Sequence, residues 1–344
     1  MSALAPAETA QPDILSVEGL TVAFQTDDRP LTVVDDVSFS LAAGRTTGMV
    51  GESGSGKTVS ALALLGLLPP NGRVAAGRAM YRGADLLSLP AGELRPLRGS
   101  RIAMVFQEPM TALNPVFSIG DQIAEVLQIH QRLSRGEAWD RAVGMLRRVG
   151  IPDPAARAFA YPHQLSGGMR QRAVIAMALA CGPDILIADE ATTALDATVQ
   201  AQILELMTDL QRQYGMAVLF ISHDLGVVSA LADDVVVLYA GRVMERAPAS
   251  EFFGRPMHPY SQGMLETLPS LTPPGHDLPT IPGTPPDLAR LPGGCRFAPR
   301  CPRAADDCRS AEPPLMEARA GTFAACIRPG QDGGQDGAPG EVSA

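Results

Sequence analysis

Long hydrophobic runs are absent from this sequence of 344 residues. A helix needs about 20 consecutive apolar residues to cross a bilayer, and the longest candidate run, Val59 to Leu68, is half that length. The segment Met1 to Pro6 has neither the charged region nor the apolar region of a secretion signal. We therefore expect the chain to reach a membrane only through partner proteins.

Positive charge is also scarce, since 28 Lys and Arg residues face 37 Asp and Glu residues and the formal net charge is −9. A protein that binds nucleic acid through its phosphates needs the opposite balance, so we expect no nucleic-acid partner. The hydrophobic content of 46% is typical of a globular protein. The length supports a large core with an additional module.

Cysteine is rare but concentrated. Four of the five cysteines fall within 32 residues with the spacing C-x5-C-x6-C-x17-C, at Cys295, Cys301, Cys308 and Cys326. A reducing cytosol disfavours disulfides, so such a quartet predicts metal or iron–sulfur ligation. The spacing lacks the C-x2-C pairs of zinc ribbons, which favours a 4Fe–4S cluster over zinc. Four unligated thiols are the remaining alternative.

A glycine-rich segment matches the pattern G-x-x-x-x-G-K-[ST] over Gly51, Glu52, Ser53, Gly54, Ser55, Gly56, Lys57 and Thr58. A strand-like run precedes it and an apolar helical run follows, which is the setting of a phosphate-binding loop. The loop amides are expected to face the α- and β-phosphates, and Lys57 to reach the β- and γ-phosphates. Thr58 is expected to bind Mg2+. A glycine-rich turn with an incidental lysine is the alternative.

Two further apolar runs end in polar side chains. Ile185 to Ala188 is followed by Asp189 and Glu190, and Val218 to Ser222 is followed by His223. Continuous apolar runs of this length are typical of strands in a parallel sheet, whose carboxyl ends meet at the nucleotide crevice. We expect Asp189 to hold Mg2+ through water, Glu190 to act as general base and His223 to bind the γ-phosphate. Solvated acids closing a strand are the alternative.

The segment Leu165 to Arg172 combines a serine, two glycines and two arginines ahead of an apolar helical run. Ser166 is a natural N-cap, and the following amides make a second anion site. A capped helix without a ligand is the alternative.

Together these motifs resemble the nucleotide-binding subunit of an ABC transporter over about residues 14–265. The resemblance implies an α/β P-loop NTPase fold with a parallel-sheet core, an antiparallel β subdomain and a helical subdomain. It also implies that two such domains pack head to tail, so that Ser166, Gly167 and Gly168 of one chain cap the ATP held by Lys57 of the other.

Three more roles follow from the resemblance. Gln107 is expected to contact Mg2+ and the attacking water, and Phe24 to stack on adenine. Asp196 is expected to belong to a nucleotide-contacting loop in which Thr193 stands where serine is commoner. The segment from Gln107 to Phe117 is expected to meet a permease.

The C-terminal part resembles the extension of ATPases from dipeptide and oligopeptide importers, through His258-Pro259-Tyr260, Pro282 to Pro286 and Cys295 to Cys301. Met169 is typical of the "D"-type subunit of that group. The resemblance implies a 4Fe–4S cluster, with zinc as the alternative, and a structural role, because nothing in the sequence places the cluster near the nucleotide.

The implied partners are a second related ATPase, two membrane permeases and an extracytoplasmic peptide-binding protein, with this chain on the cytoplasmic face of the cell membrane. A nickel or other small-solute importer of the same architecture is the alternative. A soluble ABC ATPase of DNA repair or translation would need coiled-coil insertions or tandem nucleotide domains, which the sequence lacks.

The expected organisation has four parts. Residues 1–13 form a loose tail, and residues 14–265 form the nucleotide-binding domain, with its helical subdomain at about 96–165. Residues 266–328 form the Cys-rich extension, and residues 329–344, which are rich in Gly, Asp and Gln, form a disordered tail.

Overall fold

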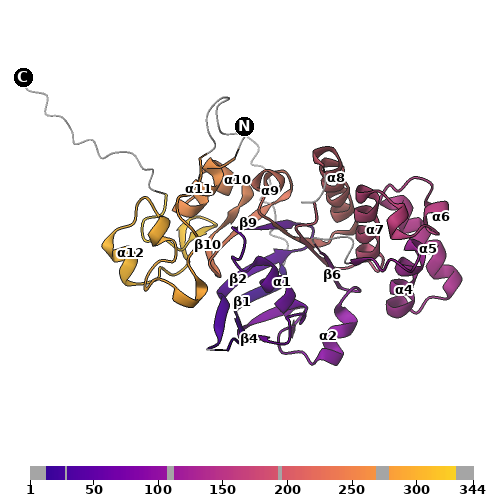
Figure 1. Cartoon of the computed structure of the whole chain (residues 1–344), viewed down its shortest axis with the longest axis horizontal. Helices are drawn as coiled ribbons and strands as arrows, with labels where there is room; N and C mark the ends of the chain where they lie inside the picture. The colour runs from indigo at the N-terminus through magenta and orange to yellow at the C-terminus, as the bar shows by residue number, and fades with distance from the viewer. Residues whose placement is uncertain (1–12, 28, 107–111, 193–195, 269–278, 331–344) are drawn as a thin grey trace, which may run out of the picture.

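The computed structural model describes residues 13–27, 29–106, 112–192, 196–268 and 279–330. Within these ranges, no helix is both long enough and apolar enough to span a bilayer. Figure 1 shows an elongated molecule, with the segment around α12 (Asp306–Ser310) at one end and helices α4 (Ile119–Gln131) and α5 (Arg135–Arg148) at the other.

An eight-stranded sheet forms the centre of the molecule, in the order β11-β12-β10-β9-β3-β8-β7-β6. Its parallel part consists of β9 (Asp234–Tyr239), β3 (Thr46–Val50), β8 (Ala217–Ser222), β7 (Ile185–Asp189) and β6 (Ile102–Val105). Every residue of β3, β7 and β8 is buried, because helices and a second sheet cover both faces. This is why β7 and β8 are almost continuously apolar.

A second, antiparallel sheet of four strands has the order β2-β1-β4-β5. It contains β2 (Leu31–Ala42), β1 (Asp13–Phe24), β4 (Gly72–Tyr81) and β5 (Ala84–Asp85). Helix α1 (Lys57–Leu64) contributes Ala61 and Leu64 to one core with apolar side chains of both sheets. The structure thus confirms the expected parallel core and antiparallel β subdomain.

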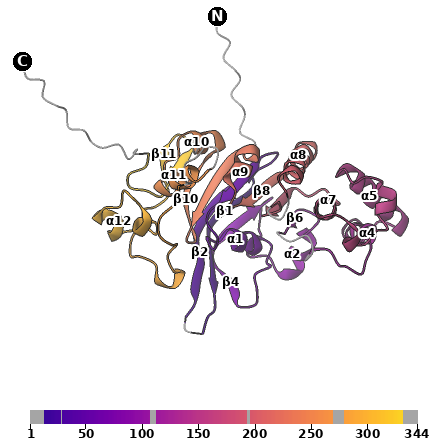
Figure 2. The same ribbon diagram turned by 45° about the horizontal axis from the view of Figure 1, so that its top comes forward.

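The helices α4, α5, α6 (Pro154–Arg157) and α7 (Gly167–Leu179) form a lobe beyond β6 (Figure 2). Local sequence fixes where two of them start. The Ser118 hydroxyl accepts from the Asp121 amide at the start of α4, and Ser134 and Glu137 form a capping box at the start of α5. Helix α8 (Ala197–Tyr214) packs next to α7 and leads into β8.

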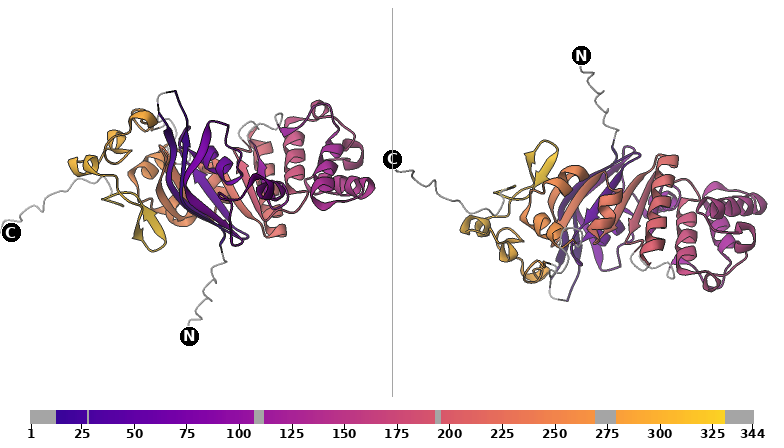
Figure 3. Two further views of the ribbon diagram at one scale, coloured as in Figure 1. Left: turned by 90° about the horizontal axis from the view of Figure 1, so that it is seen from below. Right: turned by 90° about the horizontal axis from the view of Figure 1, so that it is seen from above.

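The C-terminal segment extends the central sheet. Strand β10 (Arg242–Pro248) pairs antiparallel with β12 (Thr322–Ala324), which pairs with β11 (Met316–Arg319). Helices α10 (Ala249–Gly254) and α11 (Pro259–Glu266) contact β10 at this edge, whereas α9 (Leu225–Leu231) contacts β3 and β8. Helix α2 (Ala91–Leu97) contributes Leu94 to the core of the antiparallel sheet. Figure 3 shows the C-terminal segment at the opposite end of the molecule from the helical lobe. Phe297 is buried in the same core as Tyr239 and Tyr260. The extension therefore shares both a sheet and a core with the nucleotide-binding part.

Candidate functional site

The glycine-rich loop joins β3 to α1. Three of its glycines have positive φ, namely 149° at Gly51, 78° at Gly54 and 101° at Gly56. A Cβ atom at Gly51 would lie 2.1 Å from the Leu238 carbonyl oxygen. Side chains other than glycine are therefore excluded at Gly51, and the backbone can curl tightly as a phosphate-binding loop requires.

Lys57 lies at the centre of this loop with its side chain buried. Its Nζ donates to the carbonyl oxygens of Gly51, at 2.7 Å, and Glu52, at 2.9 Å. Burial lowers the pKa of Lys57, and the carboxylates of Glu190, Asp189 and Glu52 oppose that shift. The loop therefore holds a buried amino group among carbonyls, ready to bind an anionic ligand.

The first residues of α1 meet the end of β7. The Thr58 hydroxyl donates to the Asp189 carboxylate at 3.2 Å. Burial raises the pKa of Asp189, and the hydrogen bond from Thr58 partly opposes that rise. A hydroxyl and a carboxylate side by side are the oxygen ligands that Mg2+ prefers. These two residues would suit a bound magnesium ion, which would supply positive charge beside the loop.

Glu190 and His223 face each other beyond β7 and β8. The distance between His223 Nδ1 and Glu190 Oε1 is 3.0 Å. Glu190 has a φ of 48°, and its amide donates to the Ile221 carbonyl at 2.9 Å. A non-glycine residue in this left-handed conformation is strained, and such strain concentrates at functional sites. The acid and the imidazole are thus held together at the carboxyl ends of the parallel strands, where a water molecule can reach them.

The other predicted site residues have different surroundings. Ser166 caps α7 by accepting from the Met169 amide at 3.3 Å, and Gly167 and Gly168 begin that helix in the helical lobe. Phe24 is half-buried at the end of β1, and Asp196 caps α8 by accepting from the Val199 amide at 3.0 Å.

In the loop, Ser53 and Gly54 are exposed, whereas Ser55 and Gly56 are buried. Gln107 and Thr193 lie outside the described residues.

Sequence reasoning assigned no role to Glu52 within the loop or to Tyr260 and Arg300 beside it. The Glu52 amide donates to the Tyr260 hydroxyl at 3.0 Å, and Arg300 Nη1 donates to the Glu52 carboxylate at 2.9 Å and 3.0 Å. A pocket of about 580 Å³ lies here, and its lining includes Gly51, Glu52, His223 and Arg300. Arg300 of the extension therefore contacts the loop. The pattern G-x-x-x-x-G-K-[ST] leaves the Glu52 position open, so it gave no signal for this contact.

The predicted 4Fe–4S cluster is wrong, and its zinc alternative is equally unsupported. Cys295, Cys301, Cys308 and Cys326 are free, half-buried and line one small pocket of about 20 Å³. In the part of the chain that the structure describes, however, no three His, Cys, Asp or Glu side chains are placed to hold a metal ion. Burial raises the pKa of Cys295 to about 11, which favours the neutral thiol over the thiolate that a metal needs. The sequence shows that four thiols are close along the chain, but it does not determine the directions in which they point.

Two protein-family models match the chain. The model described as ABC transporter matches residues 34–193. The model described as oligopeptide/dipeptide transporter, C-terminal region, matches residues 244–308. The first match covers the glycine-rich loop. The second match covers most of β10 and the first three of the four clustered cysteines.

Curated proteins match over nearly the whole length. The oligopeptide transport ATP-binding protein OppD of Escherichia coli K12 is 50% identical over 329 residues, which cover 95% of this chain and 97% of that protein. The dipeptide transport ATP-binding protein DppD of the same organism is 46% identical over 322 residues, covering 94% and 98%.

Among solved structures, the dimeric ATP-binding cassette MJ0796 in a post-hydrolysis state with ADP and Pi aligns with a TM-score of 0.61 and 26% identity, over 68% of this chain and 98% of that one. The structure of cbiO1 from Clostridium perfringens, part of the ABC transporter complex cbiONQ, aligns with a TM-score of 0.60 and 26% identity, over 70% and 91%.

Proposed function

This chain belongs to the ABC transporter family, and because it also carries the oligopeptide/dipeptide transporter region, we propose that it is the ATP-hydrolysing subunit of a peptide importer. Its fold is the P-loop NTPase fold of ABC ATPases, as the sequence predicted. Relatives that match it over nearly their whole length are ATP-binding proteins for oligopeptide and dipeptide transport.

One observation carries the hydrolytic activity. The loop with Lys57, the Thr58–Asp189 pair and the Glu190–His223 pair all lie where β3, β7 and β8 end. These three strands are neighbours in the parallel part of the sheet. The carboxyl ends of these strands thus bring together a phosphate-binding loop, a pair of metal ligands and an acid–imidazole pair. Phosphoryl transfer to water needs this arrangement.

Each residue has a distinct part in this proposal. Thr58 and Asp189 would hold Mg2+, which neutralises phosphate charge when it is bound. Lys57 exchanges its carbonyl partners for oxygens of the β- and γ-phosphates. Glu190 takes a proton from the attacking water as general base, and His223 holds that water and the γ-phosphate in position. Gln107, by its resemblance to the family's glutamine, contributes to both the metal and the water.

The second anion site, Ser166 to Gly168, acts in a partner subunit. We propose that a second related ATPase packs head to tail with this chain, so that the N-terminus of α7 covers the γ-phosphate in the partner's loop. Figures 1 and 2 show α7 in the helical lobe, away from α1. In that arrangement neither chain has a complete site alone, and Phe24 and Asp196 contribute to binding the nucleotide.

Membrane permeases are the remaining partners. Polar and apolar side chains together line a pocket of about 940 Å³ beside α4 and α5, and two apolar members of that lining, Phe117 and Phe159, have exposed fractions of 53% and 67%. The neighbouring Val116 is 71% exposed. We propose that this surface, with the segment from Gln107, meets the permeases at the cytoplasmic face of the cell membrane. We propose that an extracytoplasmic peptide-binding protein completes the complex. The domain limits given above are part of the same proposal.

The test is ATP turnover by the complete reconstituted complex with loaded binding proteins. We expect dipeptides or longer peptides to stimulate hydrolysis. Stimulation by nickel chelates with no response to any peptide would contradict the peptide assignment while leaving the ATPase assignment intact. The absence of any ATP hydrolysis, with all subunits present, would contradict both.

A further inference from the structure

Glu52 places a carboxylate in a loop whose ligand is a polyanion. Like charges at short range repel, and the repulsion grows where water is partly excluded. The Glu52 side chain is 29% exposed, and its carbonyl oxygen accepts from Lys57 Nζ at 2.9 Å. An acid in this position opposes triphosphate binding unless a cation compensates it.

Arg300 of the C-terminal extension is that cation. Its Nη1 lies 2.9 Å and 3.0 Å from the two Glu52 carboxylate oxygens, and its side chain is only 6% exposed. Its other two nitrogens donate to backbone carbonyls, Nε to Pro282 at 3.0 Å and Nη2 to Ile281 at 3.2 Å. The guanidinium is therefore fixed by the extension itself and does not depend on Glu52 for its position.

An aromatic cluster supports the same contact. The rings of Tyr239, Tyr260 and Phe297 pack with centroid distances of 4.6 Å to 5.4 Å. The Tyr260 hydroxyl accepts from the Glu52 amide at 3.0 Å, and the Tyr239 hydroxyl accepts from Arg300 Nη1 at 3.2 Å. Both ends of Glu52, its amide and its carboxylate, are thus bound to groups outside the loop.

We propose that Arg300 is a positioning residue of the ATP site, through which the C-terminal extension neutralises Glu52 and sets the affinity of the phosphate-binding loop for a nucleoside triphosphate. The inference rests on the proposed ATPase function, since it assigns a role at that same site. Arg300 acts through Glu52 and not on the reacting atoms. Its loss should therefore raise the KM for ATP and leave kcat nearly unchanged.

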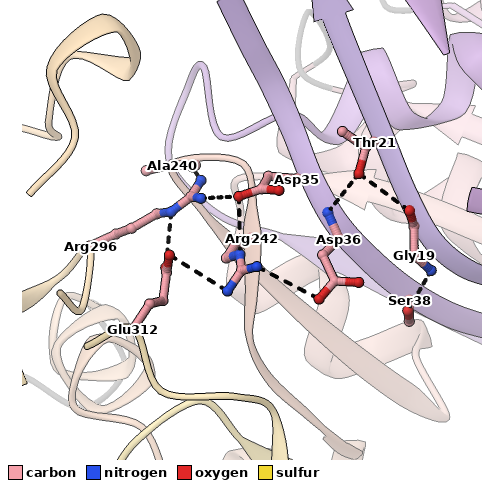
Figure 4. A network of polar contacts seen from close by, with 9 residues as sticks. All are labelled: Gly19, Thr21, Asp35, Asp36, Ser38, Ala240, Arg242, Arg296 and Glu312. Atoms are coloured by element: carbon pink, nitrogen blue, oxygen red, sulfur yellow. Dashed lines mark hydrogen bonds and ion pairs between the residues drawn. The ribbon is translucent and has the colours of Figure 1, made fainter. Parts of the chain in front are cut away.

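Arg296 provides a matched control, because it is four residues earlier and its side chain is equally buried, at 5% exposure. Figure 4 shows its guanidinium between Asp35 of β2 and Glu312, with Nη1 donating to the Ala240 carbonyl at 2.6 Å. Its connection to the loop is indirect and runs through the backbone, where the next amide, that of Gly241, donates to the Ser55 carbonyl. Loss of Arg296 should loosen the extension without exposing the Glu52 charge.

The experiment titrates Mg-ATP into the full chain and its variants, and measures KM and kcat in the assembled transporter. Arg300→Gln should weaken ATP binding about 10-fold, or about 1.4 kcal/mol. It should raise KM to the same extent, with kcat within about 2-fold. In Glu52→Gln/Arg300→Gln, where no charge remains to be compensated, the affinity should return to within about 3-fold of the wild type. Arg296→Gln should lower the Tm but shift ATP affinity less than about 2-fold.

Three results would overturn the inference: wild-type affinity in Arg300→Gln, an equal loss in Arg296→Gln, or no recovery in the double variant. If Arg300→Gln does not fold, Arg300→Lys can be used, because it keeps the positive charge but lacks the planar guanidinium group. That variant should bind ATP within about 3-fold of the wild type, and a loss of 10-fold or more would contradict charge compensation. The Lys57→Ala variant separates the two proposals. If it binds ATP as well as the wild type, the proposed function itself fails, whatever Arg300 does.

Discussion

The carboxyl ends of β7 and β8 and the contact between the C-terminal extension and the loop are two polar clusters of different character. At the strand ends, each functional group lies at or just beyond the end of a buried strand, as Asp189 ends β7 and His223 follows β8. In the second cluster, Arg300 of the extension binds Glu52 across a sequence separation of 248 residues. The first cluster is built by local sequence, the second by the tertiary fold, and the two meet at the phosphate-binding loop.

This difference explains what sequence could predict. The glycines of the loop dictate its backbone locally, and the end of a parallel strand determines where the next residue lies. Lys57, Thr58, Asp189, Glu190 and His223 could therefore be assigned to one site from their positions in the sequence alone.

The contacts of the C-terminal extension could not be predicted in this way. Four cysteines clustered within a short segment suggested a metal centre, but the spacing leaves the directions of the thiols open. Among the described residues, no three His, Cys, Asp or Glu side chains are placed to hold a metal ion. The Arg300–Glu52 contact depends on how β12 pairs with β10 and on how Phe297 enters the core. Neither feature has a local sequence signal.

The largest expected effect concerns the strand-end cluster alone. Glu190→Gln removes the proposed general base, so ATP turnover should fall by about 100-fold or more. ATP binding should persist and the closed dimer should accumulate. Steady-state ATPase assays with size-exclusion chromatography in Mg-ATP check both points, and undiminished turnover would exclude Glu190 as the base.

Lys57→Ala acts on the loop where the two clusters meet. It removes the charged donor proposed to bind the phosphates, so ATP affinity should fall by about 10- to 100-fold. Direct binding titration measures the loss. Equal affinity in the variant would mean that the glycine-rich segment is a turn and not a nucleotide site.

Tyr260→Phe cuts one connection between the clusters while keeping the ring packed against Tyr239 and Phe297. The Glu52 amide then lacks its partner, which should cost about 1–3 kcal/mol of unfolding free energy. Denaturant unfolding of the wild type and the variant measures this cost. Identical midpoints and slopes would show that the hydroxyl does not stabilise the loop.

The smallest expected effect concerns His258, whose ring contacts Phe297 of the C-terminal extension. Burial, together with the positive charge of Arg303, lowers the pKa of His258 to about 3, although a hydrogen bond with the Ala325 backbone partly opposes this shift. The unfolded chain therefore binds a proton below pH 6.5 that the folded chain does not bind, so stability should fall as pH falls from about 6.5 toward 3.

From pH 6.5 to 5.5 this group should remove about 1 kcal/mol of unfolding free energy. His258→Asn keeps an acceptor for the Tyr260 amide, which His258 Nδ1 now binds at 3.0 Å. Denaturant unfolding at the two pH values should show a loss in the variant that is smaller by this amount. An equal loss in both proteins would mean that another group titrates.

The connection between the two clusters is tested most directly by amide hydrogen exchange of Gly51 to Thr58 in the nucleotide-free full chain. Wild type, Arg300→Gln and Arg296→Gln should be compared under one condition, with β3 and β8 as internal references. The account predicts faster exchange of the loop amides in Arg300→Gln, with wild-type rates in Arg296→Gln and unchanged strands in both. Wild-type loop exchange in Arg300→Gln would contradict it.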